Sequence, residues 1–146
     1  MIASVPDTFV QLENEISGDI GFRLFTVLLV DLPDVVRVHS SNPREYAVTG
    51  RKRMGPTPWG AHVIAGGKPW LGSTPADLKW AFTDHALIAS LGCGCCINIP
   101  VRRDDQTIGT LNLLDVAQRY TADHLNRAAK YADRFVPLLD AVLNKG

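Results

Sequence analysis

The sequence lacks the features that define several classes of protein. Its only cysteines are crowded together at Cys93, Cys95 and Cys96, which excludes the disulfide framework of small secreted domains. Fifteen acidic residues balance fifteen basic ones, so no overall field attracts nucleic acid or an anionic membrane. The longest apolar run, at 27–30, is far too short to span a bilayer. The first residues have neither a basic start nor an apolar run, so we expect no signal peptide and a cytoplasmic location.

What is present is typical of an ordinary globular domain. The chain has 146 residues, of which 46% are hydrophobic and 21% are charged. This length and composition predict one domain over residues 1–146 with enough apolar side chains for a real core.

An antiparallel β-hairpin is the clearest structural pattern in the sequence. Its strands are expected at 95–101 and 107–114, joined by a polar turn at 103–106. Because side chains alternate across a strand, one face of the first strand is predicted to be apolar, with Cys95, Ile97, Ile99 and Val101. The opposite face carries Cys96 and Asn98, and the second strand contributes Asn112. Such a hairpin can cover a core on one side and a pocket on the other.

The rest of the chain predicts a single sheet with helices on both faces. Helices are expected at 8–18, 57–65, 74–80, 84–91 and 121–144, and further strands at 21–30, 35–41 and 68–72. Residues 42–56 show no period and are expected to form an irregular crossover. Pro137 lies inside the last predicted helix and should kink or divide it. Alternation in the strand at 35–41 places Arg37 and His39 on the same face.

Several motifs in a fixed order resemble the GAF domain family. They are TPWGAHVIAGGKPWLG, DHALIASLGCG, a strand ending at Pro100, the strand IGTLNLLD, and a Tyr-Thr-x-Asp helix start. The resemblance extends from about residue 8 to 143. It implies an α+β fold with terminal helices on one face of an antiparallel sheet and short helices or loops forming a pocket on the other. GAF domains are small ligand-binding modules, and a few are enzymes. Their terminal-helix face commonly pairs two protomers, so we expect a homodimer, and the apolar stripe of the last predicted helix is wider than one sheet face needs.

The cysteine cluster has two interpretations. Cys93 could be a redox or nucleophilic thiol, or the cluster could bind a soft metal. A thiol becomes reactive as the thiolate, near a cation, a metal or a helix N-terminus, whereas this cluster follows the C-terminal end of a predicted helix. Alternatively, Cys95 is a small core residue and the other two line the sheet. One GAF branch reduces free methionine sulfoxide with a thiol, but its cysteines lie in the crossover and well before the Pro-ended strand, where this chain has none.

A second hypothesis joins His62, Asp84 and His85, with His39 as a further member. If these side chains lie together at one rim of the predicted pocket, they could bind a divalent metal or perform acid–base chemistry. The alternative is structural: Asp84 is well placed to cap a helix, and the histidines could bond to the backbone.

Aromatic and basic residues gather in and around the crossover. The aromatic set suits a planar or apolar ligand, although it could equally anchor the short helices to the sheet: Tyr46, Trp59, Trp70, Trp80 and Phe82. The basic set could steer a carboxylate or phosphate, or form a solvated loop: Arg44, Arg51, Lys52 and Arg53. Asn98 and Asn112 each need hydrogen-bond partners, which a ligand, buried water or loop backbone could supply.

The sequence thus predicts a stand-alone sensory or regulatory domain that binds a small molecule and signals through a partner protein or through dimer geometry. The predicted ligand-binding residues are Trp59, His62, Trp70, Trp80, Asp84, His85, Cys96, Asn98 and Asn112. The alternative is a small thiol- or metal-dependent enzyme that uses Cys93 or the set His62, Asp84 and His85. The sequence identifies no ligand, metal or cofactor, and neither nucleic acid nor membrane is an expected partner.

Overall fold

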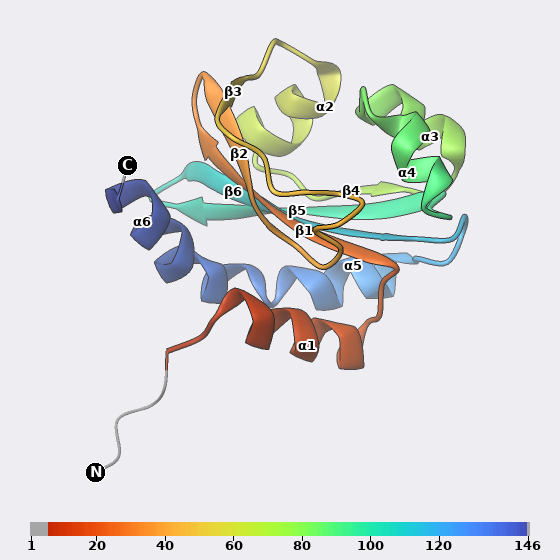
Figure 1. The fold of residues 1–146 in the computed structure, drawn as a ribbon, viewed down its shortest axis with the longest axis horizontal. Helices are drawn as coiled ribbons and strands as arrows, with labels where there is room; N and C mark the ends of the chain where they lie inside the picture. Colours follow the sequence, from red (N-terminus) through yellow and green to blue (C-terminus); the bar gives the residue numbers. More distant parts are fainter. Residues whose placement is uncertain (1–5, 146) are drawn as a thin grey trace.

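An antiparallel sheet of six strands divides the molecule into two layers (Figure 1). The computed structural model describes residues 6–145; residues 1–5, which the expectation about a signal peptide concerns, lie outside this range. The strands are β1 (Leu24–Asp31), β2 (Asp34–Ser40), β3 (Lys52–Arg53), β4 (Trp70–Gly72), β5 (Cys95–Arg103) and β6 (Gln106–Asp115). Their order is β3-β2-β1-β6-β5-β4, and every neighbouring pair is antiparallel. The α+β prediction and the central hairpin of β5 and β6 are confirmed.

The helices occupy the two faces as the sequence predicted. The terminal elements cover one face: α1 (Phe9–Asp19), α5 (Ala122–Ala129), the 3-10 turn η2 (Ala132–Phe135) and α6 (Val136–Lys145). The short helices lie over the other: α2 (Pro58–Gly60), its π-helical continuation η1 (Ala61–Ala65), α3 (Pro75–Ala81) and α4 (His85–Ser90). None of the helices within residues 6–145 is both long and apolar enough to cross a membrane.

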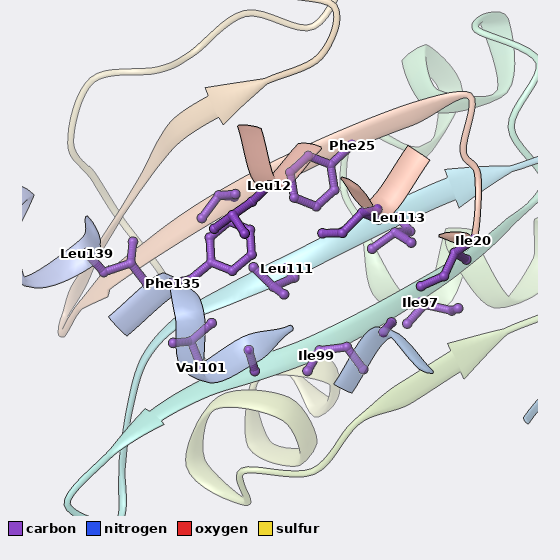
Figure 2. Packing of buried hydrophobic residues seen from close by; sticks show 14 of the residues in the cluster. Leu12, Ile20, Phe25, Ile97, Ile99, Val101, Leu111, Leu113, Phe135 and Leu139 are labelled. Carbon is purple, nitrogen blue, oxygen red and sulfur yellow. The ribbon is translucent and has the colours of Figure 1, made fainter. Parts of the chain in front are cut away.

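The main core lies between the sheet and the terminal helices (Figure 2). The predicted apolar face of β5 is buried there, and Val101 is fully buried. Phe25 of β1 and Phe135 of η2 are also fully buried, with ring centroids 6.1 Å apart. Burying a side chain of this size contributes about 1.5–3 kcal/mol to the free energy of folding. The layer of terminal helices therefore stabilises the sheet, and the opposite face of the sheet is available to form a site.

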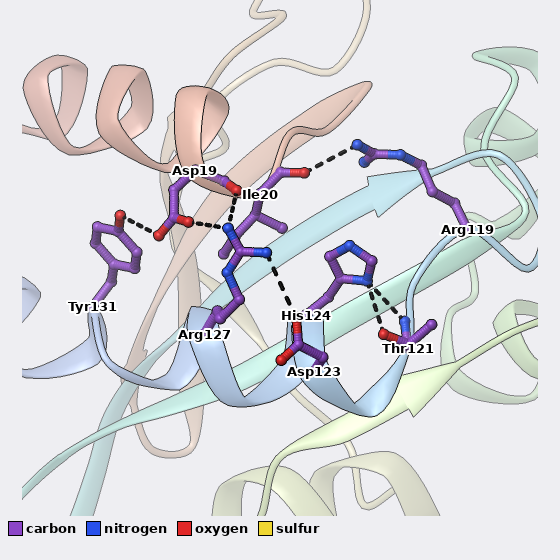
Figure 3. A network of polar contacts seen from close by, with 8 residues as sticks. All are labelled: Asp19, Ile20, Arg119, Thr121, Asp123, His124, Arg127 and Tyr131. Atoms are coloured by element: carbon purple, nitrogen blue, oxygen red, sulfur yellow. Dashed lines mark hydrogen bonds and ion pairs between the residues drawn. The ribbon is translucent and has the colours of Figure 1, made fainter.

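Polar contacts fasten the end of α1 to the C-terminal helices (Figure 3). Arg127 of α5 pairs with the Asp19 carboxylate, and the Tyr131 hydroxyl donates to the same carboxylate at 2.8 Å. Arg119 donates to the Ile20 carbonyl at 3.0 Å. Helix α1 ends one residue later than the predicted stop at Gly18. These contacts join the end of α1 to the segment from Arg119 to Tyr131 on one face of the sheet.

The predicted single helix at 121–144 is wrong in one respect. The chain is divided, but the break lies at Lys130 and Tyr131, between α5 and η2, rather than at Pro137. Pro137 is the second residue of α6, where a missing backbone N–H breaks no intrahelical bond. The predicted irregular crossover also contains a short strand, β3, which pairs with the start of β2.

A β-bulge in β2 overturns the predicted alternation of that strand. His39 is opposite Val27 of β1 and Arg37 is opposite Leu28, so Val38 is the extra residue. The bulge turns Arg37 toward the short helices, where it contacts Tyr46, while the His39 ring stacks on Phe9 in the terminal-helix layer at 5.4 Å. Arg37 and His39 therefore lie on opposite faces.

Candidate functional site

A pocket of about 310 Å³ lies between the sheet and the short helices. Thr26 and Leu28 of β1 and Asn112 and Leu114 of β6 contribute from the sheet. The other lining residues come from β2, from the crossover that includes β3, from the start of α2, and from α3, α4 and the segment that joins them. The volume is at the lower end of the range of about 300–1,000 Å³ that is typical of sites for small organic molecules.

Three of the five aromatic residues singled out above line this pocket. They are Tyr46, Trp59 and Phe82, and the rings of Trp59 and Phe82 are 5.5 Å apart. Trp70 and Trp80 are not among the lining residues. Their rings contact each other at 5.6 Å, and Trp80 is 52% exposed. The aromatic set thus divides into a pocket wall and a pair that packs elsewhere.

A row of polar side chains crosses the sheet at the base of the pocket. Asn98 of β5 is directly opposite Asn112 of β6, which is directly opposite Thr26 of β1. The Trp59 indole donates to Asn98 Oδ1 at 3.0 Å, Asn98 Nδ2 donates to Asn112 Oδ1 at 2.7 Å, and Asn112 Nδ2 donates to Thr26 Oγ1 at 3.1 Å. Thr110 also donates to Asn112 Oδ1 at 3.1 Å. Neighbouring side chains thus supply the partners that a ligand, water or loop backbone was expected to supply.

Arg37, Tyr46 and Asp84 form a polar cluster in the pocket wall. The Tyr46 hydroxyl donates to Asp84 Oδ2 at 2.5 Å, and the Arg37 guanidinium lies 3.8 Å from the centre of the Tyr46 ring. Arg37 Nη2 is 3.6 Å from Asp84 Oδ2. Burial, reinforced by the adjacent Asp84 carboxylate, raises the pKa of Tyr46, so its phenol stays protonated and remains a donor. Asp84 makes no side-chain capping bond to α4, so its carboxylate serves this cluster.

The basic residues of the crossover separate into two groups. Lys52 and Arg53 line the pocket and are exposed to solvent. Arg51 pairs instead with Asp31 at 2.7 Å and Asp34 at 3.6 Å. Arg44 does not line the pocket. Of these four basic residues, only Lys52 and Arg53 contribute charge to the site.

The histidines do not assemble with Asp84. His62 Nε2 lies 3.0 Å from the Pro69 carbonyl, and His39 Nε2 lies 2.8 Å from Glu13 Oε1 on the opposite side of the sheet. Neither His62 nor His85 lines the pocket, whereas Asp84 does. Residues 6–145 contain no group of three or more His, Cys, Asp or Glu side chains placed to hold a metal ion. His39 cannot share a rim with Asp84, because the bulge in β2 directs it into the other layer.

All three cysteines are buried free thiols. Burial raises the pKa of Cys93 to about 11, with a smaller contribution from Asp115 and opposition from Arg23. Burial likewise raises the pKa of Cys96 well above its ordinary value, and its Sγ lies 3.4 Å from Asn98 Oδ1. A nucleophilic or metal-binding cysteine needs the opposite shift. The environment of the cluster is that of small core residues.

The sheet order, the two helical layers and the pocket together define a GAF domain fold. Solved structures with this fold superpose on nearly the whole chain. The GAF domain of a two-component sensor histidine kinase from Bacillus halodurans has a TM-score of 0.71 at 14% identity, covering 95% of this chain and 98% of that one. The GAF domain of a phosphoenolpyruvate-protein phosphotransferase from Coxiella burnetii has a TM-score of 0.73 at 14% identity, covering 98% and 88%.

An enzyme is also among the similar structures. The free methionine-R-sulfoxide reductase from Neisseria meningitidis, solved in complex with its substrate, has a TM-score of 0.65 at 17% identity, covering 94% of this chain and 80% of that one. No protein-family model matches the sequence, and no curated protein matches it either. At these identities the likeness establishes the fold, and the chain therefore has the GAF domain fold.

Sequence reasoning placed some residues at the pocket and missed others. Among the predicted ligand-binding residues, Trp59, Asp84 and Asn112 line the cavity. Asn98 and Cys96 are fully buried beside it. Thr26 and Arg37 were not singled out. The register of the β5–β6 hairpin alone could not have identified Thr26, because Thr26 lies on β1, which is distant in sequence. Arg37 was missed because the alternation of β2 gave no sign of the bulge.

Proposed function

We propose that this protein binds a small organic molecule in the pocket above the sheet and acts as a sensory or regulatory domain. The observation that carries the proposal is the pocket itself: about 310 Å³ in volume, with an aromatic wall at Trp59 and Phe82 and a base whose two asparagine side chains already have partners. A site with this balance of apolar wall and few polar groups suits a small organic ligand.

Similar structures support this proposal at the level of the fold. One of them is the GAF domain of a two-component sensor histidine kinase, and the methionine sulfoxide reductase was solved with its substrate bound. The chemistry of the site favours binding over catalysis. The Cys93 thiol is held protonated, and His62 and His85 lie outside the pocket lining. The alternative of a small thiol- or metal-dependent enzyme thus lacks an activated group in the pocket.

Signalling through dimer geometry or a partner protein belongs to the same proposal, as does a cytoplasmic location. The apolar stripe of the C-terminal helices, which favoured a dimer, packs mainly into the core through Phe135 and Leu139. Of the large apolar residues on α1, α5 and α6 within the described range, Val10 is the most exposed, at 59%. The expected homodimer therefore rests on the resemblance, and light scattering at several protein concentrations tests it.

A screen of small organic fragments by thermal shift tests the binding proposal. Fragments that bind should raise the melting temperature, because a ligand that binds only the folded state stabilises it. The variant Ala81→Leu adds bulk to the pocket lining and should abolish these shifts. Ala89→Leu, on the exposed surface of α4, is the matched control and should retain them. Shifts that survive equally in both variants would place binding elsewhere and contradict the proposal.

A further inference from the structure

The hydrogen bonds at the base of the pocket have a fixed direction. An indole N–H can only donate, so the group that faces Trp59 Nε1 must be the oxygen of Asn98. The amide nitrogen of Asn98 then faces Asn112, which must present its oxygen. Asn112 in turn directs its amide nitrogen to Thr26 Oγ1 at 3.1 Å. The donor-only indole thereby sets the orientation of both amides.

Thr26 is the last member of this row of hydrogen bonds, and its hydroxyl proton is available to a ligand in the pocket. Its oxygen accepts a hydrogen bond from Asn112 Nδ2, and its proton remains free to be donated to a further group. Within residues 6–145, Thr26 Oγ1 accepts this hydrogen bond and donates none. Thr26 is 4% exposed and lines the cavity. The base of the pocket thus offers one directed donor to an acceptor atom of the ligand.

Positive charge gathers at the other end of the cavity. Lys52 of β3 is opposite Val35 of β2, which is opposite Val30 of β1. Val30 is four residues from Thr26, a rise of about 13 Å along the strand. Lys52 and Arg53 line this end and have no ion-pair partner among the residues that the structure describes. The Arg37 charge is matched by Asp84, 3.6 Å away, so the lining carries uncompensated positive charge.

We infer that the ligand is a small organic anion with an apolar or aromatic body, whose anionic group faces Lys52 and Arg53 and whose far end presents an acceptor to the Thr26 hydroxyl. This inference rests on the proposed function and specifies the ligand class of the same site. Trp59 and Phe82 contact the body of the ligand. Thr26 determines specificity through its directed donor, and Trp59 positions that donor through the two asparagines.

Three matched probes separate the two ends of the ligand. 4-Acetylbenzoate has an acceptor and a carboxylate; 4-isopropylbenzoate keeps the shape and charge but lacks the acceptor; 4-acetylbenzamide keeps the acceptor but lacks the charge. Isothermal titration should show 4-acetylbenzoate binding to the wild-type protein about tenfold more tightly than 4-isopropylbenzoate. It should also bind several-fold more tightly than the amide, and this second advantage should shrink as salt is added.

Variants assign each preference to its residues. Thr26→Val should remove the advantage of the acetyl probe over the isopropyl probe, and Thr26→Ser should keep it. Retained binding of 4-isopropylbenzoate shows that the Thr26→Val pocket is intact; if that variant does not fold, the probe comparison in the wild-type protein decides. The double variant Lys52→Gln, Arg53→Gln should remove the advantage of the carboxylate over the amide. Arg51→Gln is the control, because its partners are Asp31 and Asp34.

The inference is overturned if 4-acetylbenzoate fails to bind more tightly than 4-isopropylbenzoate, or fails to bind more tightly than 4-acetylbenzamide. It is also overturned if the variants leave these two differences in affinity unchanged. Failure of all three probes while other fragments bind to the wild-type pocket would overturn the ligand class and leave the proposed function intact. If no fragment stabilises the protein at all, both fail.

Discussion

Asn98 and Asn112 are opposite each other on β5 and β6, and the amide of the first donates to the amide oxygen of the second at 2.7 Å. Asn98 is fully buried, and the pair joins the Trp59 indole above the sheet to Thr26 of β1. Hydrogen bonds in such a buried row polarise one another and are costly to leave incomplete. This row links the covering helix α2 to the base of the pocket.

Removing Asn98 should therefore destabilise the fold. Asn98→Ala removes the acceptor of the Trp59 indole, and a buried donor left unpaired costs about 1–3 kcal/mol. Asn112 Oδ1 loses one donor and keeps the bond from Thr110. Urea unfolding of Asn98→Ala, Asn112→Ala and the double variant should give a coupling free energy of about 0.5 kcal/mol or more. Asn126→Ala, at an exposed position on α5, should change stability little. If the losses in unfolding free energy of Asn98→Ala and Asn112→Ala are strictly additive, the two side chains do not interact as the structure shows.

Tyr46→Phe should reduce stability by about 1–3 kcal/mol, because it removes the donor that faces the Asp84 carboxylate at 2.5 Å in a partly buried site. Chemical denaturation measures the loss. Tyr131→Phe is the matched control: it removes a hydroxyl that faces Asp19 in an exposed contact and should have a smaller effect. An equal loss of unfolding free energy in the two variants would show that the hydrogen bond from Tyr46 to Asp84 stabilises the fold no more than an exposed contact does.

Cys93 should be inert in the folded protein. Its pKa is raised from an ordinary 9.0 to about 11, so the thiol stays protonated at neutral pH and through pH 9. Alkylation by iodoacetamide, followed by mass spectrometry, should be slow until the pH nears 11, whereas the urea-unfolded chain should react near pH 9. Rapid modification of Cys93 in the folded protein at pH 7 would restore the thiol-enzyme alternative.

Arg134 should make the protein more sensitive to acid than a variant that lacks it. Its hydrogen bonds hold the pKa of Asp7 below 3.8 and that of Glu15 below 4.5. Both carboxylates therefore contribute stability that is complete above these ordinary values and is lost as the pH falls through the lower folded values. Thermal unfolding between pH 7 and pH 3 should show that Arg134→Met is less stable at pH 7 and loses less stability below pH 4.5. If the melting temperatures of the wild-type protein and Arg134→Met fall in parallel with pH, the predicted role of Arg134 is contradicted.

The sequence predicted the layers of this fold well, for clear physical reasons. The apolar alternation of 95–101 specified one buried face, and the structure confirms it. Thr8 and Thr74 accept backbone N–H groups at the starts of α1 and α3, and caps are local signals. The break before η2 was misplaced because Pro137 is tolerated in the first turn of a helix, while nothing comparable marks Lys130.

The site was harder to predict because its residues meet through long-range register. The bulge at Val38 reverses the faces of Arg37 and His39, and alternation alone gives no sign of it. Thr26 reaches Asn112 only through the pairing of β1 with β6, about 86 residues apart in sequence. Trp80 resembles Trp59 in the sequence, yet it lies exposed beside Trp70, since which face of a short helix meets the sheet depends on how that helix docks.

The most direct test of the account uses the indole N–H signals of the three tryptophans in a ¹⁵N-labelled sample. Trp59 lines the pocket, whereas Trp70 and Trp80 do not, so each titration carries its own controls. Small organic ligands that stabilise the protein should shift the Trp59 indole signal and leave the Trp80 signal in place. Ligands that shift Trp80 while Trp59 stays unchanged would contradict the claim that this pocket is the binding site.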